Sequence, residues 1–438
     1  MFSINTIKSK LRKLVPADRV YLDNKLKKIE HRFPDIDHKF QSLDHKLQGL
    51  DDRIQLLDKR LSSLDSCLSD LDRYLKEFNQ GEMLRENILR EIRQSSQTQI
   101  NAIGGLKQYV NQELQRRDDW GKRASEIART ANGRSVWVIK CPAPEGTMKV
   151  GWGDYAYAVT LKRYLERLGI YTVLDTREDW GCEENADVVL VLRGCYFYRP
   201  DRRNSKCLYI MWNISHPEMV TAEEYELYDV ICVGSRYYAG QLKQKLSVPI
   251  FPLLQCTDTE LFCPAENKKT VSQWNYIFVG NSRGIARSCV MWAVEERLPV
   301  RIWGNGWSKI LPDDQELVEA PFIENSQIPD LYRSAKVTLN DHWEDMREKQ
   351  FVNNRVFDAL ACGLPVISDT CQELRDIFPD AVLYYSNKEE FRKCIRQIEE
   401  NYDEIKERVL DQWNMIQEEY SFECRAKQLV EIADKYKH

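Results

Sequence analysis

Apolar residues near the start of the chain recur at alternating spacings of three and four. The series runs without interruption from Leu26 to Phe78. Such an a/d heptad repeat predicts a left-handed coiled coil, because so narrow a stripe suits a helix–helix seam better than the broad face of a helix packed on its own domain. Pro34 occurs early in the series and is expected in the first turn of the continuous helix.

Charged residues beside this stripe predict how the helices pair. The g positions and the e positions five residues later carry opposite charges: Lys39, Lys46, Arg53 and Arg60 at g, and Asp44, Asp51, Asp58 and Asp65 at e. Opposite charges at these positions pair across parallel strands. The sequence therefore predicts a parallel homo-oligomer. Leucine dominates both a and d, so the number of strands is not predicted.

A basic segment, residues 1–33, precedes the repeat. Lys8, Lys10, Arg12 and Lys13 are mixed there with apolar residues, which is typical of an amphipathic helix on an anionic membrane surface and equally of a solvated tail. The segment lacks the apolar core of a secretion signal, and no apolar run in the chain approaches the roughly 18 residues that span a bilayer. We expect a cytoplasmic protein, with peripheral contact at the inner face of the cytoplasmic membrane as one interpretation.

After residue 133 the pattern changes to short apolar runs bounded by turns and separated by amphipathic helical segments. Strands are predicted at 135–141, 171–175, 187–194, 207–215, 229–235 and 248–254, and again at 274–280, 299–304, 335–341, 364–368 and 381–385. Buried strands that alternate with helices predict parallel sheets covered on both faces.

The two alternating blocks predict two Rossmann-like α/β domains. We expect the chain to divide into a basic segment (1–33), a coiled coil with a helical linker (34–130), a first Rossmann-like domain (131–260), and a second one with the terminal helices (261–438).

Composition excludes several classes of protein. The net charge of −5 gives no overall reason to expect nucleic-acid binding. The 13 cysteines are odd in number and include no Cys-x-x-Cys pair, which favours reduced thiols over a disulfide framework and predicts no metal site.

Ligands of open parallel sheets bind at the carboxyl ends of the strands. After the first predicted strand come Gly151, Trp152, Gly153 and Asp154, which predict a tight loop, a helix capped by Asp154, and an anion site at the helix start. The alternative is an ordinary turn.

Two further glycine loops follow strands of the second block. Gly280, Asn281 and Ser282 leave one strand, and Arg283 and Arg287 flank the start of the next helix. Two guanidiniums there predict a diphosphate clamp. Gly304 follows the next strand and is either a close approach to a ligand or a simple turn.

A fourth cluster follows the strand at 335–341. Its polar side chains stand beside an apolar helix face formed by Val356, Phe357 and Leu360, with Gly363 and Pro365 ending the helix. The predicted donor-binding residues there are Asn340, His342, Gln350, Asn353, Asn354, Arg355 and Asp358.

The motifs "FVGNSR", "LYRSAKVTLN" and "NNRVFDALACGLPVIS", together with the two Rossmann-like blocks, resemble GT-B-fold glycosyltransferases of the group 1, family 4-like type, in particular the spore-maturation-protein-like branch. The resemblance covers about residue 135 to the C-terminus. It implies a GT-B architecture with a first, acceptor domain and a second, nucleotide-sugar donor domain, and transfer with retention of configuration.

The resemblance also implies roles for single residues. In an E-x7-E pattern aligned on "DALACGLPVI", Asp358 keeps the acid expected at the ribose, whereas Gln350 replaces the acid expected near the sugar. Arg283 and Arg287 resemble the basic pair at the leaving diphosphate, and His216 resembles the active-site histidine, although a lone histidine after a strand is more often structural.

A glycosyltransferase is the leading hypothesis, and two other functions are alternatives to it. The glycosyltransferase would use a nucleotide diphosphate sugar as co-substrate and would need no metal or other cofactor. Its acceptor would be a glycan or a lipid-linked molecule, as in bacterial surface polysaccharide or glycoconjugate assembly. The missing first acid supports the alternative of a non-catalytic oligomeric scaffold with a nucleotide- or glycan-binding GT-B module. Against this alternative, the chain keeps all four of the other expected site residues, Arg283, Arg287, Asp358 and His216. A sugar-nucleotide epimerase would need proton-transferring acids and histidines, in which the predicted site is poor.

Overall fold

A computed structural model of the chain describes residues 62–70, 90–91, 93–95, 97, 104, 121–177, 180, 183, 185–202, 206–265 and 273–437. The chain divides into two compact units, residues 1–109 and 110–438. Residues 62–70, inside the predicted heptad series, are helical. The other positions of that series lie outside the described residues, and so does the basic segment 1–33. The parallel coiled coil and the membrane contact therefore stay predictions.

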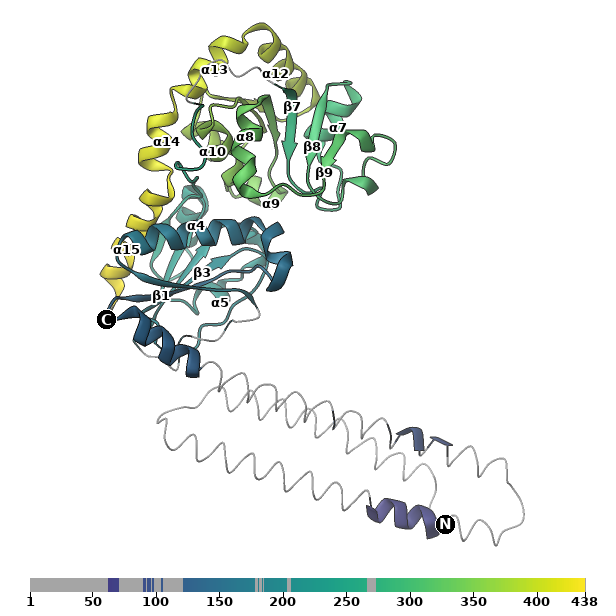
Figure 1. Cartoon of the computed structure of the whole chain (residues 1–438), viewed down its shortest axis with the longest axis vertical. Coiled ribbons are helices and arrows are strands. Elements are labelled where there is room, and N and C mark those ends of the chain that lie inside the picture. The colour runs from purple at the N-terminus through teal and green to yellow at the C-terminus, as the bar shows by residue number, and fades with distance from the viewer. Residues whose placement is uncertain are drawn as a thin grey trace, which may run out of the picture. The chain divides into compact units, whose positions relative to one another are not determined.

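The second unit contains two six-stranded sheets in which all the paired strands are parallel (Figure 1). The first has the order β2-β1-β3-β4-β5-β6. Its strands are β1 (Val136–Lys140), β2 (Tyr171–Asp175), β3 (Val188–Arg193), β4 (Leu208–Asn213), β5 (Val230–Val233) and β6 (Ile250–Pro252). Every residue of β1, β3, β4 and β5 is buried, which explains their continuous apolar runs.

The second sheet has the order β12-β11-β10-β7-β8-β9. Its strands are β7 (Trp274–Val279), β8 (Val300–Trp303), β9 (Val318–Ala320), β10 (Ala335–Asn340), β11 (Val366–Asp369) and β12 (Val382–Tyr385). All eleven predicted strands are present in the two sheets. The strand β9 was not predicted, because its three residues, two half-buried and one exposed, carry too little apolar pattern.

Helices cover both sheets. Those that matter for the site are α4 (Gly153–Arg167), α6 (Arg236–Lys243), α7 (Ser288–Glu295), α9 (Glu344–Glu348), α10 (Asn354–Ala361) and α11 (Gln372–Ile377). The terminal helices were expected to belong to the second domain. The last one, α15 (Phe422–Tyr436), instead lies beside α4 (Figure 1), and its apolar face is part of the first domain's core.

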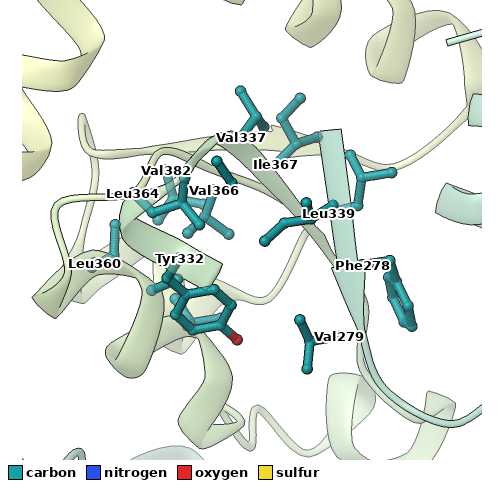
Figure 2. Packing of buried hydrophobic residues seen from close by; sticks show 14 of the residues in the cluster. Phe278, Val279, Tyr332, Val337, Leu339, Leu360, Leu364, Val366, Ile367 and Val382 are labelled. Carbon is teal, nitrogen blue, oxygen red and sulfur yellow. The ribbon is translucent and has the colours of Figure 1, made fainter. Parts of the chain in front are cut away.

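The core of the second domain holds the apolar face of α10 against the sheet (Figure 2). Val356, Phe357 and Leu360 are fully buried, as the sequence predicted. Gly363 ends this helix in the left-handed region, with φ of 72°. Because this face is buried, the helix has one orientation on the sheet. This sets where the first turn of α10 and its polar face lie relative to β10 and β11.

No helix among the described residues is long and apolar enough to cross a membrane. The cysteines in the described part of the chain are all free thiols.

Candidate active site

Two guanidiniums converge over Gly280, immediately after β7. A β carbon added to this glycine would stand 3.0 Å from Arg355 Nη1 and 3.3 Å from Arg287 Nη1. Arg287 is the residue before α7, and Arg355 lies in the first turn of α10. The bare Cα of Gly280 therefore lets two positive groups from different helices approach the end of one strand.

The cluster of Arg283, Arg287 and Arg355, called the arginine cluster below, has an excess of positive charge. Among the residues that the structure describes, Asp341 is the one carboxylate in a direct ion pair with any of the three, through Arg287, while Asp369 and Asp358 interact with Arg283 and Arg355 without such contact. Burial, followed by repulsion from Arg355, lowers the pKa of Arg283 and of Arg287. Buried like charges repel, so the arrangement favours an anion with more than one negative charge.

The glycine loops beside the cluster pack on each other. A β carbon on Gly304, whose φ is 153°, would stand 2.1 Å from the carbonyl oxygen of Gly280. The amide of Ser282 donates to the carbonyl of Asn305 over 2.9 Å, and the amide of Asn305 donates to Asn281 Oδ1 over 2.8 Å. Close approach of one protein loop to another thus accounts for Gly304.

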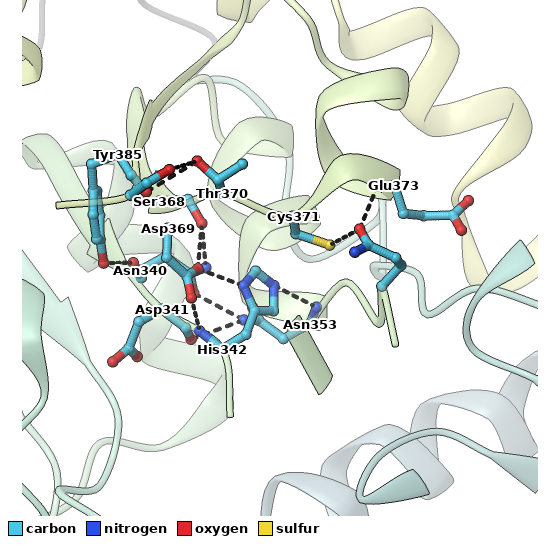
Figure 3. Close-up of polar contacts among 12 residues, drawn as sticks. Asn340, Asp341, His342, Asn353, Ser368, Asp369, Thr370, Cys371, Glu373 and Tyr385 are labelled. Carbon is cyan, nitrogen blue, oxygen red and sulfur yellow. Dashed lines mark hydrogen bonds and ion pairs between the residues drawn. The ribbon is translucent and has the colours of Figure 1, made fainter. Parts of the chain in front are cut away.

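The polar cluster after β10 forms an internal hydrogen-bond network (Figure 3). Asn340 Nδ2 donates to Ser368 Oγ at 2.9 Å, and Asn353 Nδ2 donates to Asn340 Oδ1 at 3.1 Å. His342 Nδ1 lies 2.6 Å from Asp369 Oδ1. These side chains, predicted to bind the donor, have partners inside the protein, and their observed contacts shape the loop between β10 and α10.

The side chain of Gln350 contacts Glu373 and Cys371. Its φ is 64°, and its Oε1 accepts from the amide of Glu373 at 3.1 Å, near the start of α11. The position that aligns with an acid in the E-x7-E pattern is thus neutral and engaged with another helix.

Asp358 is buried at the junction of the two domains. Its Oδ1 accepts from the hydroxyl of Thr257 at 2.5 Å, and its Oδ2 accepts from Asn354 Nδ2 at 3.0 Å. Burial raises the pKa of Asp358 to about 7, although Thr257 and Asn354 oppose the shift. The amide of Asn354 in turn donates to Gln255 Oε1 at 2.8 Å, which adds a second link between the linker after β6 and α10.

His216 lies on the first domain after β4, in the left-handed region with φ of 51°. Its ring is 5.3 Å from the ring of Trp343, and the guanidinium of Arg283 lies 4.3 Å from the centre of that same ring. Trp343 therefore joins the first-domain histidine to the arginine cluster of the second domain. Burial raises the pKa of Asp154, and His216 opposes this shift, so the two side chains interact.

The loop from Gly151 to Asp154 was expected to end in an N-cap by Asp154. In the structure Trp152 is the N-cap of α4, and Asp154 lies inside its first turn, because the helix begins two residues earlier than a cap at Asp154 requires. Phe322 of the second domain comes close to Gly151, 3.9 Å from an added β carbon. The loop therefore faces the other domain.

One group of potential metal ligands occurs among the described residues. His216, Glu218 and Asp345 have ligand atoms within 4.8 Å of one another, and His216 Nδ1 is 3.3 Å from Glu218 Oε1. No metal-like spacing in the sequence indicates this group, because its residues come from two domains.

Other contributors were missed as well. Asp341, Trp343, Asp369 and Thr257 all contact predicted site residues. Asp369 ends β11, so the rule that ligands meet strand ends could have identified it.

Comparison with known proteins finds chains of similar fold. Residues 287–431 match a family described as glycosyl transferase-like. Sucrose-phosphate synthase from Thermosynechococcus elongatus is similar in structure, with a TM-score of 0.51 and 12% identity over 69% of this chain and 99% of that chain. HepE from Anabaena, solved in complex with UDP-glucose, has a TM-score of 0.51 and 10% identity over 68% of this chain and 99% of its own. No curated protein sequence matches the chain.

These similarities define the class of the fold. The two six-stranded parallel sheets have the GT-B arrangement, and most of the second domain carries the sequence pattern of a glycosyl transferase-like family. The narrower resemblance to the spore-maturation-protein-like branch is not tested by these matches and stays a prediction.

Proposed function

We propose that the protein transfers a sugar from a nucleoside diphosphate sugar to an acceptor hydroxyl. The observation that carries this proposal is the convergence of Arg287 and Arg355 over Gly280, beside the first turn of α10. In the reaction the bond from the anomeric carbon to the diphosphate oxygen breaks, a bond to the acceptor oxygen forms, and the acceptor proton leaves. Preorganised positive charge at the departing diphosphate is what such a reaction needs most.

The other site residues have roles in this proposal. The carboxylate of Asp358 has lone pairs left after its two protein bonds and accepts from the ribose hydroxyls. His216, with Asp154 nearby, faces the reacting sugar. The arginine cluster supplies the charge that a metal would otherwise supply, and the family resemblance favours retention of configuration.

The setting of the reaction rests on the sequence. A basic amphipathic segment and a parallel coiled coil suit a homo-oligomer that works on a glycan or lipid-linked acceptor at a membrane surface, in surface polysaccharide or glycoconjugate assembly.

A second candidate is a scaffold whose GT-B module binds a nucleotide sugar without turning it over. Gln350 favours it, because this neutral side chain is engaged by the start of α11. The two candidates differ in turnover and agree in binding.

A panel of UDP-, GDP- and ADP-sugars tests the proposal. Release of the nucleoside diphosphate, followed with and without simple glycan acceptors, is expected for at least one donor, and calorimetry is expected to show binding of the matching nucleoside diphosphate. Binding without release supports the scaffold. If the protein neither binds nor releases a nucleoside diphosphate with any donor, both candidates are contradicted.

A further inference from the structure

The loop between β10 and α10 crosses from the second domain into the first. Met346 and Phe351, at 4% and 0% exposure, belong to a buried cluster otherwise formed by first-domain residues. The ring of Phe351 lies 5.9 Å from that of Tyr238 on α6. The far part of this loop, residues 343–351, is therefore anchored in the opposite domain.

The base of the same loop is closed by a chain of three groups. The amide of Asn353 donates to His342 Nε2 at 3.4 Å, and His342 Nδ1 contacts Asp369 Oδ1 at 2.6 Å (Figure 3). Asp369 Oδ2 also accepts from the backbone amide of His342 at 3.0 Å. The side chain of His342 is fully buried. Because Nε2 accepts from a backbone N–H, the imidazole proton must be on Nδ1, where it donates to the carboxylate.

The groups around this chain favour an ionised carboxylate at Asp369. Burial acts to raise the pKa of Asp369, but His342 outweighs it and the pKa is lowered, with a smaller contribution from Arg347 on α9. Arg283 also interacts with Asp369 from the loop before α7, and Tyr385 on β12 faces the same carboxylate. A second proton on His342 would set an N–H of the ring against the N–H of Asn353.

Asn353 connects this chain to the arginine cluster. It is the N-cap residue of α10, and its Nδ2 donates to the carbonyl oxygen of Asp341 at 3.3 Å. Arg287 Nη2 donates to that same carbonyl at 3.3 Å. Asn353 is 6% exposed, and its Oδ1 has no partner among the described residues. The position of Asn353 thus affects both the first amides of α10 and the guanidinium of Arg287.

We infer that Asp369 and His342 are positioning residues that close the base of this interdomain loop and thereby hold the start of α10 and Arg287 in place for a nucleoside diphosphate. The inference rests on the proposed function. Because the tip of the loop is anchored in the first domain, this closure also ties the donor site to the relative position of the two domains. A buried imidazole suits the task, since it offers one donor and one acceptor on opposite sides of a flat ring.

A pair of substitutions separates positioning from simple packing. His342→Gln keeps one donor and one acceptor on the side chain, whereas His342→Leu keeps bulk and loses both. We expect His342→Leu to weaken binding of UDP, GDP or ADP, whichever the parent binds, by at least about tenfold, because a buried amide and a buried carboxylate lose their partner. His342→Gln is expected to stay within about threefold of the parent. Asp369→Asn is expected to weaken nucleoside diphosphate binding as much as His342→Leu does. Asp330→Asn, on the exposed side of α8 (Ile328–Arg333), serves as the matched control.

Calorimetry on the full chain gives the affinities, and thermal unfolding of each variant shows whether it folds. Equal affinity of a folded His342→Leu variant and the parent overturns the inference, as does an equal loss in His342→Gln and His342→Leu.

A second measurement does not depend on nucleotide binding. Long-range ¹H–¹⁵N correlation spectra, with the His342 signals assigned by their loss in His342→Gln, are expected to show an imidazole protonated at Nδ1 only. A signal from a protonated Nε2 overturns the inference even where a nucleoside diphosphate binds. If no diphosphate binds the parent while the Nδ1–H form is observed, the proposed function fails, and with it the role assigned to the pair, although the closure of the loop stands.

Discussion

Phe351 of the second domain lies against Gly234 at the end of β5 in the first. A β carbon added to Gly234 would stand 3.0 Å from Phe351 Cδ1, closer than side chains normally approach. The backbone beside it is also linked, since the amide of Arg236, at the start of α6, donates to Glu373 Oε2 on α11 over 2.8 Å. The two Rossmann-like domains thus share buried apolar and polar contacts on the side where the β10–α10 loop enters the first domain.

Phe351→Ala is expected to lower the free energy of unfolding by about 3–5 kcal/mol, because it leaves a cavity in a closed core. Denaturant unfolding followed by tryptophan fluorescence measures it. Phe197→Ala is the control, since that ring is 52% exposed. Equal stability of the two variants contradicts the role of Phe351 as an anchor.

Gly280→Ala is expected to weaken nucleoside diphosphate binding roughly tenfold, because the added methyl group displaces the guanidiniums of Arg287 and Arg355. Calorimetry measures the affinity. Gly240→Ala on α6 is the matched control, since an added β carbon there meets no atom within 4 Å. Unchanged binding in a folded Gly280→Ala protein would place the diphosphate elsewhere.

Arg287→Ala is expected to lower turnover by about two to three orders of magnitude, and to weaken nucleotide binding much less. The positive charge acts most strongly as the diphosphate departs, whereas ground-state contacts are shared with backbone amides. Steady-state kinetics beside calorimetry separate the two effects. Arg396→Ala, on the exposed face of α12 (Lys388–Glu400), is the control. Parent-like turnover by Arg287→Ala would exclude this cluster as the catalytic site.

Asp358→Asn is expected to change how stability depends on pH. The pKa of Asp358 is about 7 in the folded protein, above the value of about 3.9 for an unfolded chain. Between these values the folded protein holds a proton that the unfolded chain releases, so this group lowers the free energy of unfolding as pH rises from about 4 to 7. Asparagine does not titrate, so the Asp358→Asn variant lacks this pH-dependent contribution to the free energy of unfolding.

From pH 5 to pH 8 the unfolding free energy of Asp358→Asn should therefore rise relative to that of the parent, by an amount on the order of a few kcal/mol. Urea unfolding at several pH values measures this. Asp330→Asn, exposed on α8, is the control. A constant difference across the range would contradict a raised pKa. In the same variant, nucleotide and nucleotide-sugar binding are both expected to weaken, because the ribose is common to both.

Chelation tests the absence of a metal requirement. Turnover is expected to be unchanged after treatment with EDTA, because the arginine cluster supplies the positive charge. If Mn²⁺ proves necessary, the group of His216, Glu218 and Asp345 is the place to look, and Asp345→Asn should then raise the Mn²⁺ concentration needed for half-maximal activity. Glu344→Gln, at the exposed neighbouring position on α9, is the matched control.

The candidate site was predictable where it depends on local order. Arg283 lies in the loop after β7, Arg287 immediately precedes α7, and Asp358 is on a helix with one apolar face. Such positions follow from a period of two or 3.6 residues. Gln350 was predicted near the sugar from its alignment, yet its amide group contacts the start of α11. A contact between a side chain and a backbone amide 23 residues away in sequence has no periodic signal, and the same holds for the rings of Trp343 and His216.

The sequence by itself determined the α/β class, all eleven strands that it predicted, and the buried face of α10, because apolar periodicity reports which side of an element leaves water. Tertiary structure alone decided the rest. It brought α15 back to the first domain, set Phe351 against Gly234, and joined Asp369, His342 and Asn353 into one chain. These contacts depend on complementary shapes and single donor–acceptor pairs between distant segments, which become defined only once both sheets have packed.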